Sequence, residues 1–277
     1  MQTLRTIVRK TLLYKSGVEY ADYSLNHAEG CSHGCTYPCY AMMMKKRCGA
    51  VSSYDDWIQP KIVSNALELL DKELPRRKDK INRVFLCFAT DPFMYNVKQM
   101  EGLTLAILKR LNQDNIKAVL ISKGAYPAAL IDKSVFNPAN EYGSTIVSLS
   151  EEFHKTFEPH AAPVSGRIQA LRQLHKAGLK TWVSMEPYPV PNVMKQDIRK
   201  ILSEVSFVDK IVFGKWNYNR KISNFKSYKQ FYNSMAYEVV RFCTENSIDV
   251  HIKEGTINLD HLAPRQSLER KLLANYV

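Results

Sequence analysis

Residues 164–185, VSGRIQALRQLHKAGLKTWVSM, join an amphipathic segment to a short apolar run. Apolar residues recur in the first part at the spacing of a helix with one buried face, as Ile168 and Leu171 do. Gly178 stands where the C-terminal cap of such a helix is expected, and the run KTWVSM begins two residues later. Because that run is continuously apolar rather than alternating, it has the character of a strand buried on both faces. The stretch therefore predicts a helix that leads directly into a parallel strand.

The same alternation of helix and strand extends over most of the chain. Short apolar runs predict strands at residues 23–26, 83–89, 117–122, 144–149, 180–185, 210–214 and 249–253. Amphipathic patterns predict helices at residues 61–74, 100–111, 164–178 and 228–245. Such alternation implies parallel strands with right-handed crossovers, and the lack of a glycine-rich phosphate motif disfavours a dinucleotide-binding sheet. We therefore expect an α/β fold, a partial (β/α)6-type TIM barrel whose site residues follow the C-terminal ends of the strands.

Length and composition are those of an ordinary soluble globular protein. The chain has 277 residues, of which 45% are hydrophobic and 24% are charged. It contains no run of about eighteen apolar residues, so no membrane partner is expected. The N-terminus lacks the apolar core of a signal peptide, so the expected location is cytoplasmic. Without a linker or a low-complexity tract, we expect a single domain over residues 1–277, with its core at about 22–220 and a C-terminal extension at 221–277.

Residues 30–41, GCSHGCTYPCYA, place three cysteines close to the end of the first predicted strand. Cys31, Cys35 and Cys39 are separated by three residues each. In a reducing compartment such a group indicates a metal site rather than a disulfide framework. Three thiolates can hold a four-iron cluster and leave one iron atom open. A tetrahedral zinc site with Cys48 as a fourth ligand is the alternative.

The cysteine loop resembles the cluster loop of the radical S-adenosylmethionine (SAM) enzymes, in particular the spore photoproduct lyase-like family. The resemblance continues in order through VFLCFATDPF (84–93), VLISKG (119–124), VSLSEEFHKTFEPHAA (147–162), RIQALRQLHKAGLKTWVSMEP (167–187) and DKIVFGKWNYN (209–219), and covers about residues 22–220. It implies an enzyme in which a [4Fe–4S] cluster on Cys31, Cys35 and Cys39 reductively cleaves SAM. The resulting 5′-deoxyadenosyl radical takes hydrogen from a substrate. An electron donor such as flavodoxin or ferredoxin is an implied partner.

The loop departs from the family pattern at one point. The family has two residues between the second and third cysteines, whereas this chain has three, with Pro38 as the apparent insertion. Proline fixes its own φ and restricts Tyr37 to an extended conformation, so a small bulge can absorb the extra residue. The departure leaves open whether Tyr37 or Tyr40 packs beside the cofactor's adenine.

Further cofactor-binding candidates follow from the resemblance at the ends of later strands. Thr90 and Asp91 are expected near the amino group of the cofactor, and Lys123 near its carboxylate. The others are Ser148 and Ser150 for the ribose or carboxylate, one of them expected to be only a helix cap, and Glu186 for the ribose or the substrate. Cys87 is a candidate hydrogen donor, because the family lyase uses a cysteine in this region. However, Cys87 is one residue out of register, so a core position is favoured.

The charge of the chain indicates the kind of substrate. A formal net charge of +12 favours a polyanionic partner, with nucleic acid first. No acidic residue occurs between Asp209 and Glu238, and this window holds the predicted substrate-binding residues Lys215, Trp216, Asn217, Tyr218, Arg220 and Lys221. The expected reaction is lyase-like repair or base or tRNA modification. The alternatives are a radical SAM enzyme that modifies a peptide or protein, and a zinc-stabilised, non-catalytic nucleic-acid-binding module.

Overall fold

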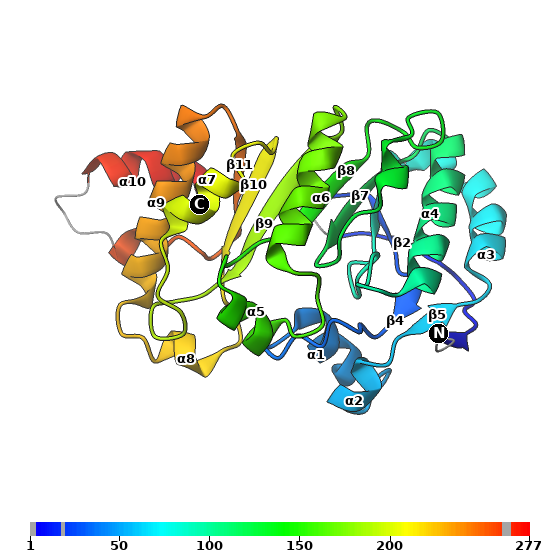
Figure 1. Ribbon diagram of the computed structural model, residues 1–277, viewed down its shortest axis with the longest axis horizontal. Coiled ribbons are helices and arrows are strands. Elements are labelled where there is room, and N and C mark those ends of the chain that lie inside the picture. Colours follow the sequence, from blue (N-terminus) through cyan, green and yellow to red (C-terminus); the bar gives the residue numbers. More distant parts are fainter. Residues whose placement is uncertain (1–3, 18–19, 262–266) are drawn as a thin grey trace. The chain divides into compact units, whose positions relative to one another are not determined.

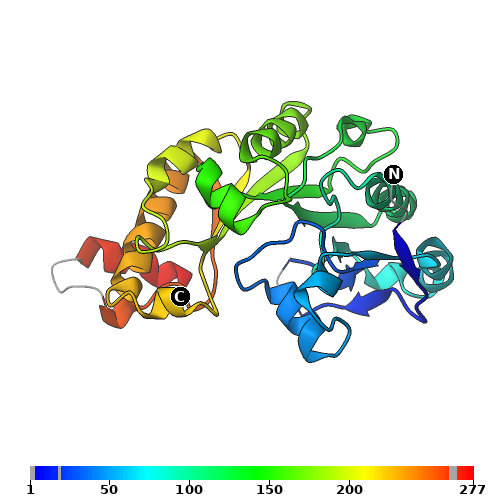
Figure 2. The ribbon, with the colours of Figure 1, turned by 60° about the horizontal axis from the view of Figure 1, so that its bottom comes forward.

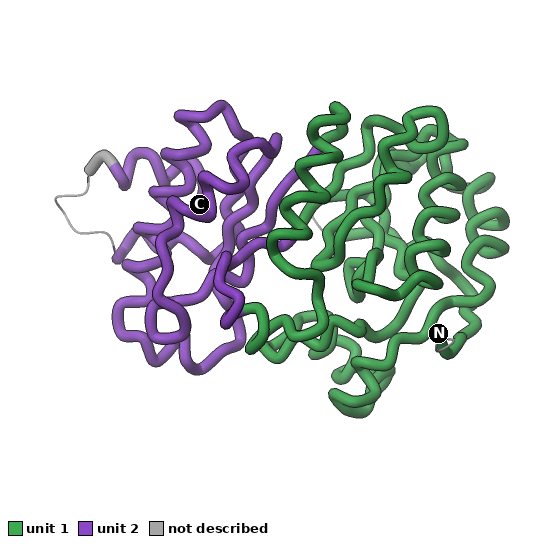
Figure 3. Tube along the Cα trace, in the orientation of Figure 1, with its two compact units in different colours: residues 1–144, 154–180 green, residues 145–153, 181–277 purple. Residues whose placement is uncertain are grey.

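The computed structural model describes residues 4–17, 20–261 and 267–277, and the chain divides into two compact units (Figures 1 and 3). Unit 1 comprises Met1–Ser144 and His154–Lys180, and unit 2 comprises Thr145–Phe153 and Thr181–Val277. The chain therefore leaves unit 1, returns to it through a second segment and then completes unit 2. The single domain expected from the sequence stays a prediction.

Unit 1 is built on a sheet of mostly parallel strands in the order β8-β7-β6-β3-β2. These strands are β2 (Leu13–Lys15), β3 (Tyr23–Leu25), β6 (Arg83–Leu86), β7 (Lys117–Ser122) and β8 (Glu141–Thr145). The register pairs Tyr23 with Val84, and Val84 with Ala118. Only β2 runs antiparallel, against β3. Strands β3, β6, β7 and β8 thus confirm the expected α/β fold with parallel strands.

Amphipathic helices accompany these strands. They are α3 (Ala66–Glu73), α4 (Lys98–Gln113) and α6 (Val164–Lys176), while α5 (Glu151–Phe157) carries the chain back into unit 1. Helix α4 buries Ile107 and Leu108, and α6 buries Leu171 and Leu174. The apolar stripes that predicted these helices are therefore the faces that they bury.

A second, small sheet in unit 1 leads into the cysteine loop. Its order is β1 (Arg5–Ile7), β5 (Lys61–Val63) and β4 (Ala28–Glu29). Strand β4 ends directly before Gly30, and the loop ends where α1 (Tyr40–Arg47) begins; α2 (Tyr54–Trp57) follows (Figure 2). The loop therefore lies between a paired strand and a helix.

Unit 2 continues the parallel pattern with the order β11-β10-β9. Its elements are β9 (Lys180–Tyr188), α7 (Ile198–Glu204), β10 (Lys210–Lys215), α8 (Arg220–Ser223), α9 (Tyr228–Glu245), β11 (Asp249–Ile252) and α10 (Ser267–Leu273). Short 3-10 turns of the whole chain lie at Leu74–Arg76, Lys78–Lys80, Ala128–Ile131, Leu259–His261 and Ala274–Tyr276. Helix α9 buries Val239, Val240 and Cys243, so its apolar face supplies much of this unit's core.

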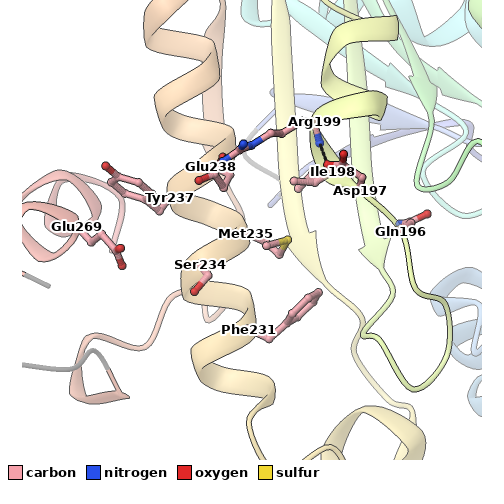
Figure 4. A pocket seen from close by; sticks show the side chains of 10 residues that line it. All are labelled: Gln196, Asp197, Ile198, Arg199, Phe231, Ser234, Met235, Tyr237, Glu238 and Glu269. Atoms are coloured by element: carbon pink, nitrogen blue, oxygen red, sulfur yellow. Dashed lines mark hydrogen bonds and ion pairs between the residues drawn. The ribbon is translucent and has the colours of Figure 1, made fainter.

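A cavity of about 410 Å³ opens between α7, α9 and α10 of unit 2 (Figure 4). Its carboxylate Glu238 accepts hydrogen bonds from Arg199 and Arg241, both at 2.9 Å. None of the residues predicted for the functional site lines this cavity.

Two predicted elements differ from the structure in the type or the position of the element. The helix expected at 61–74 is wrong in its first part, because Lys61–Val63 is strand β5 and α3 begins only at Ala66. The strand expected at 144–149 lies earlier, as β8. Ile146 beyond it still donates its N–H to the Ser184 carbonyl at 2.9 Å, so its apolar character reports burial rather than strand.

Two further strands differ from their predicted length by three residues, whereas β3, β10 and β11 differ by one. The strand expected at 83–89 ends at Leu86, because Cys87 has a φ of 62°, in the left-handed region that a strand does not use. The strand expected at 180–185 continues to Tyr188, which pairs with Lys215 of β10. No helix within the described ranges has the length and apolar character that a membrane span requires.

Candidate functional site

The cysteine loop begins at a position that only glycine can occupy. Gly30 has a φ of +84°, and a Cβ atom there would lie 2.6 Å from the Trp57 carbonyl oxygen. Cys31 donates its backbone N–H to the same oxygen at 2.9 Å. The missing side chain thus allows the close approach that fixes the first cysteine.

His33, in the first half of the cysteine loop, is buried and contacts three residues outside the loop. Its ring is 1% exposed, and its Nε2 atom accepts the backbone N–H of Tyr95 at 2.9 Å. Its Nδ1 atom lies 3.3 Å from Oδ2 of Asp91, and its carbonyl accepts the N–H of His160 at 3.2 Å. His33 therefore has a packing role in the loop, between two cysteines.

Asp91 is buried, and its carboxylate contacts residues of the cysteine loop, of its own segment and of the end of β7. Its Oδ1 accepts the Ser122 hydroxyl at 2.7 Å and the Phe93 N–H at 2.9 Å, while Oδ2 accepts the Lys123 N–H at 2.9 Å. Burial opposes ionisation, but the facing His33 and these donors outweigh it and lower the pKa of Asp91 to about 2. The expected contact with the cofactor's amino group stays a prediction, and the described partners make Asp91 an organiser of the loop.

Thr90, its neighbour, donates its hydroxyl to the Gly30 carbonyl. The start of the cysteine loop is thus tied to the segment that follows β6. The hydroxyl oxygen keeps its lone pairs, so Thr90 can still accept a hydrogen bond from a ligand.

The second half of the loop is held by residues 156–158, where α5 ends. Thr36 donates its N–H to the Phe157 carbonyl at 3.0 Å and its hydroxyl to the Thr156 carbonyl at 2.7 Å. Tyr37 donates its hydroxyl to Oε1 of Glu158 at 2.9 Å. The segment between Cys35 and Cys39 is thus hydrogen-bonded to residues outside the loop, and the small bulge at Pro38 stays a prediction.

Glu158 belongs to a group of buried charges that was not expected from the sequence. Its Oε2 lies 2.7 Å from Nη1 of Arg167, and the two side chains are 2% and 1% exposed. Burial opposes its charge, but Arg167 and Lys123 outweigh this and keep the pKa of Glu158 below its usual value. No local signal in the sequence indicated this pair, because each residue has polar neighbours, such as Lys155 and Ser165.

Lys123 lies at the edge of the same group. Its Nζ is 4.0 Å from Oε1 of Glu158 and 5.3 Å from the centroid of the Tyr37 ring. Burial would lower its pKa, but the neighbouring Cys35 and Glu158 raise it, so Lys123 is an ammonium ion beside the cysteine loop.

Burial favours the neutral form of two thiols in the cysteine loop. Burial raises the pKa of Cys35 to about 12 although Lys123 acts against it. Burial also raises the pKa of Cys31, and Asp91, Cys35 and Cys39 add to the effect. Thiolates in this loop therefore require positive charge beside them, which a bound metal supplies.

The positions of the cysteine side chains help to decide between a single zinc ion and a four-iron cluster. Within the described parts of the chain, no three His, Cys, Asp or Glu side chains gather as one metal ion requires. A four-iron cluster bonds each cysteine to a different iron atom, so it needs three thiols on one loop and not a tight tetrahedron. Cys48, the fourth ligand of the zinc alternative, is exposed beyond α1. The donor set fits the cluster.

The structure distinguishes the two tyrosines of the loop. Tyr37 is 5% exposed and bonded to Glu158. Tyr40 is 46% exposed, and its ring packs edge-on against Phe88 with the centroids 5.8 Å apart. Of the two rings, that of Tyr40 is accessible.

Cys87 is a core residue. It is 1% exposed, and its Sγ lies 3.4 Å from Nδ1 of His27, whose Nε2 is 2.8 Å from the Thr104 hydroxyl. Cys31 packs against the buried cluster to which Cys87 and Met94 belong. This placement agrees with the core position favoured from the sequence, and its role as hydrogen donor stays a prediction.

The candidates Ser148, Ser150 and Glu186 belong to unit 2. Ser150 Oγ accepts the N–H of Phe153 at 3.3 Å, so Ser150 is the helix cap of the two serines. Ser148 is 2% exposed, and its Oγ accepts the N–H of Ser150 at 3.1 Å. Glu186 lies within β9 and not at its end, and its Cδ would lie 2.8 Å from a Cβ on Gly214.

Trp216 is wrong as a substrate-stacking residue. It is 2% exposed, its backbone N–H donates to the Tyr232 hydroxyl at 3.0 Å, and its ring packs edge-on against Phe153. An aromatic residue that directly follows a buried strand is recruited into the core despite its basic neighbours. The other predicted substrate contacts are half-buried Lys215 and Asn217 and exposed Tyr218, Arg220 and Lys221.

Comparison with known proteins defines the class. The model of the Radical SAM superfamily matches residues 25–205, and the chain belongs to this superfamily. The superfamily is the class of enzymes that use a [4Fe–4S] cluster with SAM.

Two sequence relatives share only part of their length with it. "Uncharacterized protein ORF301" of Acidianus two-tailed virus is 25% identical over 199 residues, which are 68% of this chain and 64% of the relative. "Uncharacterized protein MJ0683" of Methanocaldococcus jannaschii is 24% identical over 222 residues, 79% of this chain and 80% of the relative. The matched region thus spans less than two thirds of the viral relative.

Solved structures of spore photoproduct lyase share the fold. The lyase in complex with dinucleoside spore photoproduct has a TM-score of 0.62 at 15% identity, over 88% of this chain and 80% of the lyase. A double mutant with bound AdoMet and the same dinucleoside gives a TM-score of 0.62 at 14% identity, with the same coverage. The likeness shows the α/β fold of the partial TIM-barrel type that the sequence predicted.

Proposed function

We propose that Cys31, Cys35 and Cys39 hold the [4Fe–4S] cluster and that the enzyme acts on nucleic acid. The first part is supported by the contacts of the cysteine loop: Cys31 donates its N–H to the Trp57 carbonyl, and Thr36 and Tyr37, which lie between Cys35 and Cys39, are hydrogen-bonded to residues 156–158. When bound, the cluster and SAM supply a 5′-deoxyadenosyl radical that takes a hydrogen atom from the substrate. The residues of the chain bind, orient and shield these groups.

Three side chains are suited to bind SAM. The exposed ring of Tyr40 follows Cys39 directly and offers an apolar face to the adenine. Lys123 has three N–H donors, so its contact with Glu158 leaves donors for the cofactor's carboxylate. Thr90 keeps lone pairs for the amino group. Ser148 and Glu186 remain candidates for the ribose.

Charge supports a nucleic-acid substrate. Lys and Arg outnumber Asp and Glu by 39 to 27, and unit 2 exposes Tyr218 (69%), Arg220 and Lys221 close together in sequence. Cations neutralise phosphates, and an exposed aromatic ring stacks on an unpaired base. The lyase of the same fold holds a dinucleoside photoproduct. A lyase-like repair or a base modification of DNA or RNA is therefore the proposed reaction.

Anaerobic reconstitution tests the proposal. The protein is loaded with iron and sulfide, reduced with dithionite, given SAM and offered deuterated DNA, RNA and peptide pools. We expect about four irons per chain and deuterium in 5′-deoxyadenosine with a nucleic acid. Cys35→Ala should lose both the iron and the product, while Cys48→Ala, at an exposed cysteine outside the loop, should keep both.

Each outcome has a distinct meaning. A wild-type protein that binds one zinc ion instead of iron contradicts the cluster assignment. Deuterium transfer from the peptide pool alone would show that the enzyme modifies a protein, and the nucleic-acid part of the proposal would then be wrong.

A further inference from the structure

Ser32 has a buried polar atom without a partner in the described parts of the chain. The residue lies in the cysteine loop, directly after Cys31 and before the buried His33. Its Oγ atom is buried, and it makes no hydrogen bond to any residue that the structure describes. Native proteins leave few buried hydroxyls unsatisfied, because the lost hydration is then not replaced. The hydroxyl therefore indicates a partner that is not part of the described chain.

The other hydroxyls in and around the loop show the contrast. Thr36, Tyr37 and Tyr54 donate their hydroxyls to carbonyl or carboxylate oxygens at 2.7, 2.9 and 2.6 Å, respectively. Thr90 donates its hydroxyl to a backbone carbonyl of the loop. The hydroxyls that hold the loop in place thus have protein acceptors, and the hydroxyl of Ser32 differs from them.

The residues on both sides of Ser32 are held in place. Cys31 donates its backbone N–H to the Trp57 carbonyl at 2.9 Å. The His33 ring is 1% exposed and accepts the Tyr95 N–H at 2.9 Å. Because both neighbours are fixed, the Ser32 backbone keeps its position, and its hydroxyl depends on a partner that is brought to it.

A four-iron cluster brings suitable acceptors to this loop. Its sulfides, and the thiolates that bind it, accept hydrogen bonds and donate none, whereas a serine hydroxyl offers one O–H donor. Hydrogen bonds to these sulfurs are one of the factors that set the reduction potential of a cluster. They stabilise the more negative, reduced cluster, and they do so more strongly where the surroundings exclude water.

We infer that the Ser32 hydroxyl donates a hydrogen bond to a sulfur atom of the cluster and thereby raises the reduction potential of the cluster. The inference rests on the proposed cluster at Cys31, Cys35 and Cys39. Ser32 binds no iron atom, and it neither gives nor takes a proton. Its hydroxyl stabilises the negative charge that the cluster gains when it accepts one electron.

Two other partners would give the hydroxyl a different role. A buried water molecule would satisfy it in the apoprotein as well. The carboxylate of SAM would accept the same O–H, but Lys123 is already suited to that carboxylate. Ser32 is joined directly to the proposed ligand Cys31, and this position favours a sulfur of the cluster as the acceptor.

The test is a redox titration of the anaerobically reconstituted protein without SAM, followed by electron paramagnetic resonance. At a fixed potential, Ser32→Ala should shift the ratio of reduced to oxidised cluster about tenfold toward the oxidised form, which equals about 59 mV for one electron. Ser32→Thr keeps the hydroxyl and should restore most of the wild-type potential. Ser165→Ala, which removes an exposed hydroxyl on α6 of the same unit, is the matched control and should leave the potential unchanged.

Unfolding of the apoprotein supplies a readout that does not involve the cluster. The Ser32 hydroxyl makes no hydrogen bond in the described chain, so Ser32→Ala should not lower the midpoint of urea unfolding of the apoprotein. A lower midpoint would show that the hydroxyl is bonded without the cluster, through a buried water molecule, and would overturn the inference.

The holoprotein gives two further results that would overturn the inference. One is an unchanged potential in Ser32→Ala with the iron content of the wild type. The other is an unchanged potential with weaker binding of SAM, which would assign the hydroxyl to SAM. Should Ser32→Ala lose its iron, wild-type iron in Ser32→Thr would support the hydrogen bond, and an equal loss in both variants would contradict it. A wild-type protein that takes up no iron would instead contradict the proposed function, and the inference with it.

Discussion

The buried pair of Glu158 and Arg167 offers the most direct test of how the cysteine loop is supported. Replacing Arg167 by methionine keeps much of the side-chain volume and removes the charge 2.7 Å from the carboxylate. Glu158 then stays buried with only the Tyr37 hydroxyl at 2.9 Å and the Lys123 ammonium at 4.0 Å. The hydrogen bond from Nε of Arg167 to the Ala162 carbonyl is lost as well.

The expected cost follows from these contacts. Removing one partner of a buried ion pair typically costs about 3–5 kcal/mol, because the other charge is left uncompensated. Lys123 still offsets part of that charge, so we expect about 3 kcal/mol, plus about 1 kcal/mol for the lost hydrogen bond. A loss of this size should lower the melting temperature by about 10 °C.

The assay is urea and thermal unfolding of the apoprotein under reducing conditions. Lys176→Met, an exposed change on the same helix, is the control and should stay within about 0.5 kcal/mol of wild type. The double variant Glu158→Leu/Arg167→Met should cost less than the sum of the two single changes, by about 2 kcal/mol, because no carboxylate is left buried.

The pH dependence supplies a second readout. The pKa of Glu158 is lowered in the folded protein, so its ionised form stabilises the fold above its ordinary pKa of 4.5. That contribution disappears as the pH falls through and below this value. The difference between wild type and Arg167→Met should therefore shrink in acid. A loss below about 1 kcal/mol at neutral pH, or additive single and double variants, would refute the reasoning.

Four further predictions concern the cysteine loop and residues 216–221. Ionised Asp91 should add about 2 kcal/mol to the free energy of unfolding of the wild type above about pH 4, and this contribution is lost as the pH falls through about 2. Asp91→Asn should lack it, so the free energy of unfolding, measured in urea across pH 3–6, should depend less steeply on pH. Gly30→Ala would force a Cβ to 2.6 Å from the Trp57 carbonyl oxygen, and the iron bound after reconstitution should fall several-fold. Trp216→Ala should destabilise the protein by about 3–5 kcal/mol in thermal unfolding. By contrast, Arg220→Ala/Lys221→Ala should leave stability intact and reduce the salt slope of single-stranded DNA binding, measured by fluorescence anisotropy, by about 1–2.

The fold was predictable where a local pattern had one interpretation. Helix α9 matches its predicted range of 228–245, because apolar residues recur at helical spacing over its whole length. The prediction failed at Ile62 and Val63, whose apolar side chains fit either a helix or a strand. Their strand pairs with Thr6 and Ile7 of β1, partners far away in sequence that no local pattern can reveal.

The candidate site was predictable only in part, for a related reason. Three cysteines at a fixed spacing are visible in the sequence, because the chemistry requires that residue type. Glu158 and Arg167 could not be found, since a charged residue suggests a surface position until its burial is known. Trp216 shows the opposite case. Its basic neighbour Lys215 suggested an exposed side chain, whereas the Trp216 ring is buried and packs against Phe153.

The division of unit 1 into two segments of the chain affects its biosynthesis. The three cysteines leave the ribosome more than a hundred residues before Thr156 and Glu158, which close over the second half of their loop. At ordinary translation speeds this interval lasts roughly ten seconds. During that time the cysteine loop lacks the contacts that residues 156–158 make with its second half. We therefore expect iron to be inserted only after residues 154–180, the second segment of unit 1, have been synthesised.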